Sequence, residues 1–272
     1  MRTADRSDKV ATERHGRTWV ITINRPEQMN CVDGETAAAL KEAWLEFRDN
    51  DELYVAVLTG AGNRSFCSGA DLKALETLGP PADASLHRRR RFITDGPGYM
   101  GYSRQTDIYK PVICAVNGYA FAGGLELACL GDLRVASENA EFWVACRRWN
   151  VPLVDGGTQR LPRIVGMGWA MDLIVRGRRI DATEAMRIGL ANEVVGRGKA
   201  LERALEIAEE VAAFPQGALR TDKQAALMGW GRPLAEGLRI ECEVGQTALA
   251  SSDIEEGVRA FVEKRRGNFS ND

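Results

Sequence analysis

The chain has 272 residues, 44% of them hydrophobic, which is enough for one large domain with a buried core. Its 36 lysines and arginines against 38 aspartates and glutamates give a formal net charge of -2, which argues against a general binder of nucleic acids or membrane surfaces. The first residues, MRTADRSDK, contain no apolar signal segment, and no later apolar run approaches the roughly 20 residues that span a bilayer. We therefore expect a cytoplasmic protein.

Cysteine and histidine usage excludes several kinds of site. The six cysteines are scattered without a CxxC pair, and several lie in apolar runs, which is typical of reduced, buried thiols. The only histidines are His15 and His87, so an HExxH zinc site is excluded. A Ser-His-Asp or Cys-His site would need a histidine from the N-terminal segment or from beside an arginine run. We expect no metal site and no disulfide framework.

The first half of the chain predicts strands and one clear helix. Residues 19–24 alternate bulky and polar side chains and end at an Arg-Pro turn, which predicts a strand. Asp33 can cap an amphipathic helix that begins near Glu35. The almost wholly apolar runs 55–59 and 112–116 are typical of strands that are covered on both faces.

The stretch from Leu78 to Lys110 shows no clear period and predicts a long loop with a helical piece. It contains four consecutive arginines, Arg88 to Arg91, which indicate either a solvated helix face or a site for a phosphate-bearing ligand. Beyond Leu133 the pattern is mostly helical, with a capping box at Asp181 and Glu184 and an amphipathic stretch from 201 to 211.

Two glycine-containing turns carry the chemistry. Each follows a strand-like run and opens a helix-like one: SFCSGADLK at 65–73, and NGYAFAGGLEL at 117–127. The first N–H groups of a helix have no partner within it and attract negative charge, so two such turns that converge would form an oxyanion hole. Either turn alone is better explained by a glycine that only permits a sharp bend, because glycine before a helix is more often just a tight turn.

Together these segments resemble a known family. NRPEQMN at 24–30, the two glycine turns, GGTQRLPR at 156–163 and EGVRAFVEKRRGNF at 256–269 are similar to the enoyl-CoA hydratase and isomerase family, the crotonase superfamily. The resemblance runs from about Val10 to Phe269. It implies an α/β fold, a crotonase-like spiral of ββα repeats in residues 1–200, followed by a C-terminal helical region in 201–272 that forms homotrimers. We expect residues 1–9 to be disordered.

The resemblance also implies the site. The N–H groups of Ala70 and Gly123 would hold the thioester oxygen of an acyl-coenzyme A, and Glu126 would act as acid and base. The coenzyme A portion would lie near the two turns and near the C-terminal helix of a neighbouring subunit. The residues expected there are Gln28, Met29, Ser68, Gly69, Asp71, Leu72 and Lys73, with Phe261 and Lys264 from the neighbour.

One departure from the family pattern affects the mechanism. Family hydratases carry a second glutamate 20 residues after the first, and this chain has Cys146 there. A small packing residue is the favoured interpretation of Cys146, because no histidine is evidently available to activate the thiol. Asp155 is the candidate substitute acid, and the alternative is that Asp155 only binds nearby backbone.

The sequence therefore predicts an enoyl-CoA hydratase-like enzyme of fatty acid metabolism that acts on acyl-CoA thioesters through an enolate. It is expected to need no cofactor beyond the coenzyme A of its substrate, and to assemble as a trimer or a dimer of trimers. An enoyl-CoA isomerase that uses a single carboxylate and a non-catalytic acyl-CoA binding protein are the alternatives. Acyl chain length and pathway stay open.

Overall fold

The computed structural model describes residues 8–271. Its centre is a six-stranded sheet in the order β1-β2-β3-β5-β7-β10, in which only β1 runs antiparallel to its neighbour. The strands are β1 (Val10–His15), β2 (Thr18–Ile23), β3 (Val55–Gly60), β5 (Val112–Val116), β7 (Leu133–Ser137) and β10 (Glu193–Val195).

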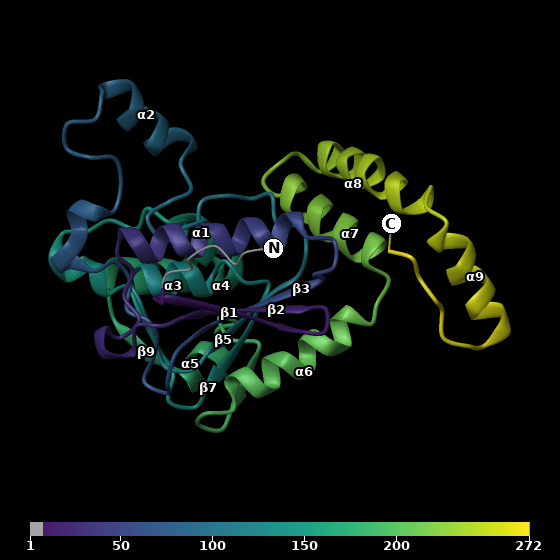
Figure 1. Cartoon of the computed structure of the whole chain (residues 1–272), viewed down its shortest axis with the longest axis horizontal. Helices are drawn as coiled ribbons and strands as arrows, with labels where there is room; N and C mark the ends of the chain where they lie inside the picture. Colours follow the sequence, from purple (N-terminus) through teal and green to yellow (C-terminus); the bar gives the residue numbers. More distant parts are fainter. Residues whose placement is uncertain (1–7, 272) are drawn as a thin grey trace.

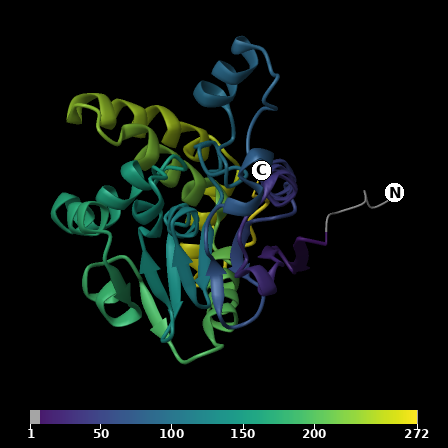
Figure 2. The same cartoon turned by 90° about the vertical axis from the view of Figure 1, so that its left-hand side faces the viewer.

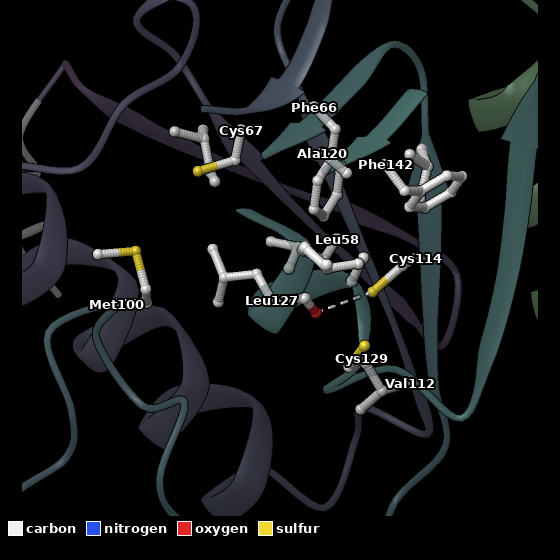
Figure 3. Packing of buried hydrophobic residues seen from close by; sticks show 14 of the residues in the cluster. Leu58, Phe66, Cys67, Met100, Val112, Cys114, Ala120, Leu127, Cys129 and Phe142 are labelled. Carbon is white, nitrogen blue, oxygen red and sulfur yellow. Dashed lines mark hydrogen bonds between the residues drawn. The ribbon is translucent and has the colours of Figure 1, made fainter. Parts of the chain in front are cut away.

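A smaller sheet lies beside the first and has the order β4-β6-β8-β9. Its strands are β4 (Ser65–Cys67), β6 (Tyr119–Phe121), β8 (Glu141–Trp143) and β9 (Arg179–Asp181). Figure 3 shows how the two sheets share a core: Phe66, Ala120 and Phe142 come from three neighbouring strands of the small sheet and lie near Leu58 of β3. The Cys114 thiol donates to the Leu127 carbonyl at 3.5 Å in the same core.

Helices cover both faces of the large sheet. The core on one face includes α1 (Gly34–Asp49), α3 (Gly123–Ala128) and α4 (Gly157–Arg176), and α6 (Ala200–Ala212) packs on the other face. All six residues of β3 are buried, as its continuous apolar run predicted. Asp33 accepts a hydrogen bond from the Thr36 N–H at 2.8 Å, which confirms the predicted cap of α1.

The remaining helices lie at the periphery. The arm that carries α2 (Leu86–Asp95) projects from the body of the molecule, and α7 (Gln216–Gly229), α8 (Leu234–Leu249) and α9 (Asp253–Glu263) extend on one side (Figures 1 and 2). The short elements are η1 (Pro26–Gln28), η2 (Leu72–Thr77), η3 (Ala145–Trp149) and α5 (Ala182–Arg187). No helix within residues 8–271 combines the length and apolar character needed to cross a membrane.

Several expectations were wrong in detail. Strands β7 to β10 follow Leu133, where a mostly helical pattern was expected, because each is three to five residues long and is defined by pairing with distant strands. The capping box is half formed: the Asp181 carboxylate accepts from the Glu184 N–H at 2.7 Å, whereas the Glu184 carboxylate binds Arg178 and Arg187.

Other expectations concern the cysteines, the arginine run, the N-terminal residues and the division at residue 200. Five of the six cysteines are buried, and all six are free thiols. The four arginines of α2 are exposed, as expected of a solvated helix face. The disorder expected for residues 1–9 falls, for 1–7, outside the described residues, and Lys9 makes an ion pair with Asp33 at 2.8 Å. The division at residue 200 stays a prediction, although α6 beyond it packs on the large sheet.

Candidate active site

The two glycine turns meet at the edge of the small sheet. Gly69 has φ +92°, and a Cβ atom there would lie 2.9 Å from the Gly123 nitrogen. A Cβ atom on Gly123 would in turn lie 3.4 Å from the Gly69 Cα atom. Only glycine allows so close an approach of the two backbones, so the structure brings the predicted pair of N–H donors, at Ala70 and Gly123, together.

Each of these N–H groups is left free by the backbone around it. The Val32 N–H donates to the Gly69 carbonyl and the Asp71 N–H donates to the Val32 carbonyl, both at 2.8 Å, so the pairing skips Ala70. Gly123 is the first residue of α3, whose first N–H groups have no partner inside the helix. Within residues 8–271 neither N–H makes a hydrogen bond with the protein.

One detail of the prediction is wrong. The Ala70 donor does not begin a helix, because the residues after it form only the 3-10 turn η2 and Ala70 itself lies in an extended bridge to Val32. The Gly123 donor does begin a helix, and Ala122 before it has φ +49°, a strained conformation for alanine. The second donor is therefore held by a backbone that costs folding energy to maintain.

Glu126 lies on the first turn of α3 and is 2% exposed. Its Oε1 atom accepts from the N–H groups of Asp155 at 2.9 Å and Gly157 at 2.8 Å, which precede and begin α4. The pKa of Glu126 is raised to about 7: burial raises it most and the charge of Asp155 adds to the increase, while the two N–H donors and Arg160 oppose it. A carboxyl group with a pKa near neutrality can both accept and release a proton at physiological pH.

Cys146 lies in η3 and is 5% exposed. Burial raises the pKa of its thiol, and the charge of Glu126 contributes to that increase, whereas Arg147 lowers it. The thiol is therefore kept in its protonated, poorly nucleophilic form. The structure thus brings Cys146 near Glu126, where family hydratases carry their second glutamate, without making it reactive.

Asp155 is also close to Glu126, but its side chain turns to another segment. Its Oδ1 atom accepts from the Met100 N–H at 3.0 Å and from the Ser103 hydroxyl group. Arg160 donates to the Ser103 carbonyl at 2.5 Å and to the Asp155 carbonyl at 3.2 Å. Sequence reasoning missed Met100, Ser103 and Arg160, although Arg160 belongs to the GGTQRLPR motif and could have been found there.

The residues expected to hold coenzyme A form two neighbouring segments. The Ser68 N–H donates to the Met29 carbonyl at 3.1 Å, which joins the turn that contains Gln28 and Met29 to the first glycine turn. Asp71 binds the Arg25 guanidinium at 3.0 Å and accepts from the Lys73 N–H at 3.1 Å, so its side chain is a support for this turn. The side chains of Gln28, Leu72 and Lys73 are exposed beside it.

Phe261 and Lys264 are not brought to these segments within one chain. They lie at the end of α9, which extends away from α3 and α4 (Figure 1), and Phe261 is 85% exposed. A cavity of about 690 Å³ lies elsewhere, between α4, α7 and the segment 104–109. Arg160 and Gly156 line it, whereas Ala70, Gly123 and Glu126 do not.

Comparison with known proteins identifies the family to which this chain is similar. The family model described as enoyl-CoA hydratase/isomerase matches residues 13–272. The chain is similar to (E)-benzylidenesuccinyl-CoA hydratase of Thauera aromatica, with 37% identity over 96% of this chain and 98% of that protein. It is also similar to crotonyl-CoA hydratase of Syntrophomonas wolfei, with 35% identity over 96% of this chain and 98% of that protein.

The fold has solved counterparts of similar length. The crystal structure of an enoyl-CoA hydratase from Bacillus anthracis superposes with a TM-score of 0.85 and 33% identity, over 97% of this chain and 100% of that chain. This likeness covers both sheets and the C-terminal helices, so it extends well beyond the two glycine turns. The chain belongs to the enoyl-CoA hydratase/isomerase family, the crotonase superfamily.

Proposed function

We propose that the protein hydrates 2-enoyl-CoA thioesters through an enolate that the N–H groups of Ala70 and Gly123 stabilise. The observation that carries the proposal is the pair of partner-free N–H groups at adjoining turns, with a buried carboxyl group on the helix that the second turn begins. Relatives named as hydratases of crotonyl-CoA and benzylidenesuccinyl-CoA support the same chemistry.

The reaction needs this arrangement because hydration moves negative charge onto the thioester oxygen. When the oxygen of water bonds to Cβ, the electrons of the double bond pass to the carbonyl oxygen and form an enolate, which is then protonated at Cα. Fixed N–H donors stabilise that developing charge, and removal of one such donor typically lowers kcat by about 10² to 10³-fold.

Glu126 supplies the proton transfers in this proposal. In its ionised form it takes a proton from the attacking water, and in its protonated form it returns one to Cα. The pKa of about 7 places both forms within reach at neutral pH. Oε1 is already held by two N–H groups, which leaves Oε2 to face the substrate.

The isomerase alternative has one specific observation in its favour. Cys146 occupies the position of the second family glutamate, and a cysteine supplies no carboxylate; burial also raises the pKa of its thiol. An isomerase moves one proton between carbons and needs only Glu126. A non-catalytic acyl-CoA binder would keep the N–H pair, and it would have no need of a carboxyl group with a pKa near 7.

The proposal includes the binding of coenzyme A along the segments that contain Gln28, Met29, Ser68, Gly69, Asp71, Leu72 and Lys73. Lys73 is exposed and would meet a phosphate as a point charge. Phe261 and Lys264 would join this site from a neighbouring subunit of a homotrimer. The unpaired thiols fit a reducing cytoplasm, which we propose as the location.

The test is to incubate the protein with 2-enoyl-CoA and 3-enoyl-CoA thioesters of short, medium and long chain and to identify the products by mass spectrometry and chromatography. Hydration of 2-enoyl-CoA adds the mass of one water to the substrate. Conversion of 3-enoyl-CoA into 2-enoyl-CoA without a change of mass would favour the isomerase. Tight binding of these thioesters with neither product would favour the non-catalytic binder.

A further inference from the structure

The carboxylate of Asp155 lies where the turn before α4 meets the loop 96–105 that follows α2. Asp155 is 2% exposed, and Ser103, which donates its hydroxyl group to Oδ1, is 0% exposed. The second donor to the same oxygen is the Met100 N–H at 3.0 Å. One buried oxygen atom of Asp155 therefore accepts hydrogen bonds from two residues of the same loop, Met100 and Ser103.

The loop is folded closely around this oxygen. Gly98 has φ +94°, and a Cβ atom there would lie 2.5 Å from Asp155 Oδ1 and would also collide with the Ser103 hydroxyl group. Arg160 adds bonds from its guanidinium to the carbonyls of Ser103 at 2.5 Å and Gln105 at 3.3 Å. The loop thus reaches the buried carboxylate only because residue 98 has no side chain.

This loop borders the oxyanion hole. Met100 is 1% exposed, and its sulfur atom lies so close to Gly123 that a Cβ atom on Gly123 would be 2.6 Å from it. A shift of the Met100 backbone would therefore change the packing behind the Gly123 donor. The backbone N–H of Asp155 donates to Glu126 Oε1 at 2.9 Å, so one residue contacts the loop through its side chain and Glu126 through its main chain.

The arm formed by α2 depends on the same loop. No residue of α2 is buried, and the arm is attached to the loop by an edge-to-face contact between Phe92 and Tyr99, with ring centroids 5.3 Å apart. Arg104 also donates to the Ile93 carbonyl at 2.5 Å. With so few contacts of its own, α2 takes its position from the loop beneath it.

We propose that Asp155 is a positioning residue, whose carboxylate fixes the loop 96–105 and so the base of α2 and Met100 against Gly123. It does not exchange a proton with the substrate. The hydrogen bonds that hold the loop both end on Oδ1, from the Met100 N–H and the Ser103 hydroxyl group, so this oxygen acts as a structural acceptor. The effect on turnover rests on the proposed hydration, whereas the effect on the loop does not.

The first test compares Asp155→Asn with Asp155→Ala. Asparagine keeps an oxygen acceptor of the same shape, so we expect it to retain turnover within about tenfold of wild type, whereas alanine removes the acceptor and should lose more. If Asp155 instead transferred a proton, the asparagine variant would lose roughly 10² to 10⁴-fold, because an amide cannot perform that transfer. Equal loss of turnover in both variants would overturn the proposal. Asp155→Asn should also move the acid limb of the pH profile to lower pH, because the charge of Asp155 raises the pKa of Glu126.

The second test needs no substrate and measures amide hydrogen exchange. Ser103→Ala removes one donor to Oδ1 and is expected to speed exchange in residues 86–105, as is Asp155→Ala, whereas Asp155→Asn should leave it near wild type. Asp181→Ala is the matched control, since Asp181 also accepts a backbone N–H, at the start of α5. Unchanged exchange in both Ser103→Ala and Asp155→Ala would overturn the proposal, even if the protein proves to hydrate no enoyl-CoA.

Discussion

The reactivity of Glu126 comes from its surroundings more than from its residue type. An exposed glutamate is ionised at neutral pH, but burial on the first turn of α3 raises the pKa of this one to about 7. Desolvation penalises the charged form, and the nearby Asp155 adds to the penalty. The sequence could suggest the residue through its motif, but the pKa follows from burial that only the fold provides.

Glu126→Gln is expected to abolish turnover of an enoyl-CoA substrate. Glutamine preserves the shape of the side chain and its acceptor oxygen but cannot carry a proton, and a positioned acid or base contributes about 10² to 10⁴-fold. Cys146→Ala is the matched control: it should change thermal stability more than rate, because the buried thiol packs and does not react. A silent Glu126→Gln together with an inactive Cys146→Ala would contradict this assignment and indicate thiolate chemistry.

Activity is expected to rise with pH through about 7. Glu126 must be ionised to accept a proton from water, so kcat/KM should follow the ionised fraction of the free enzyme. The folded protein holds this proton more tightly than the unfolded chain does, so the group favours folding below about pH 4.5 and this contribution is lost as the pH rises through about 7. An acid limb that stays near pH 4.5 would argue against Glu126 as the titrating group.

At the scale of elements, local sequence patterns predicted some strands and helices correctly but not the pairing that leaves the Ala70 N–H free. Continuous apolar runs predicted β3 and β5, and the Asp33 cap predicted the start of α1. The partner-free N–H of Ala70 was expected from a helix start, yet it arises from a bridge to Val32, far away in sequence. Such a pairing leaves no local signal, and the same holds for the edge strand β1, most of whose residues are not buried.

Gly69→Ala is expected to lower turnover by about 10² to 10³-fold, which is the usual effect of losing one donor of an oxyanion hole. The added Cβ atom would lie 2.9 Å from the Gly123 nitrogen, and φ +92° is strained for alanine, so both donors would be displaced. Gly168→Ala is the control, because nothing lies within 4 Å of a Cβ atom there. Steady-state kinetics with a 2-enoyl-CoA checks both, and equal rates would remove Gly69 from the site.

At the scale of the whole molecule, the C-terminal helices carry apolar surface that one chain leaves uncovered. On α9, Phe261 is 85% exposed, Val262 is 72% exposed and Val258 is 58% exposed. Large exposed apolar patches are typical of surfaces that meet another protein. The family resemblance predicted a trimer that forms through this region. The pattern of one sequence does not specify how a second chain would be placed against it.

Sedimentation velocity is therefore expected to show a trimer, or a hexamer made of two trimers, at micromolar concentration. Phe261→Asp should weaken the assembly, because it introduces an unpaired charge into an apolar contact. Ile93→Asp is a suitable control, since Ile93 is 62% exposed on the projecting arm and not on α9. A wild-type monomer would contradict the prediction.

The measurement that tests the central claim most directly is the conversion of a 2-enoyl-CoA thioester in water enriched in heavy oxygen. If Ala70 and Gly123 hold the enolate while Glu126 activates water, the product should gain one water molecule whose heavy oxygen is bonded at Cβ. The same incubation with Glu126→Gln should yield almost none of this product. Absence of heavy oxygen from the wild-type product, or equal incorporation by Glu126→Gln, would contradict the account.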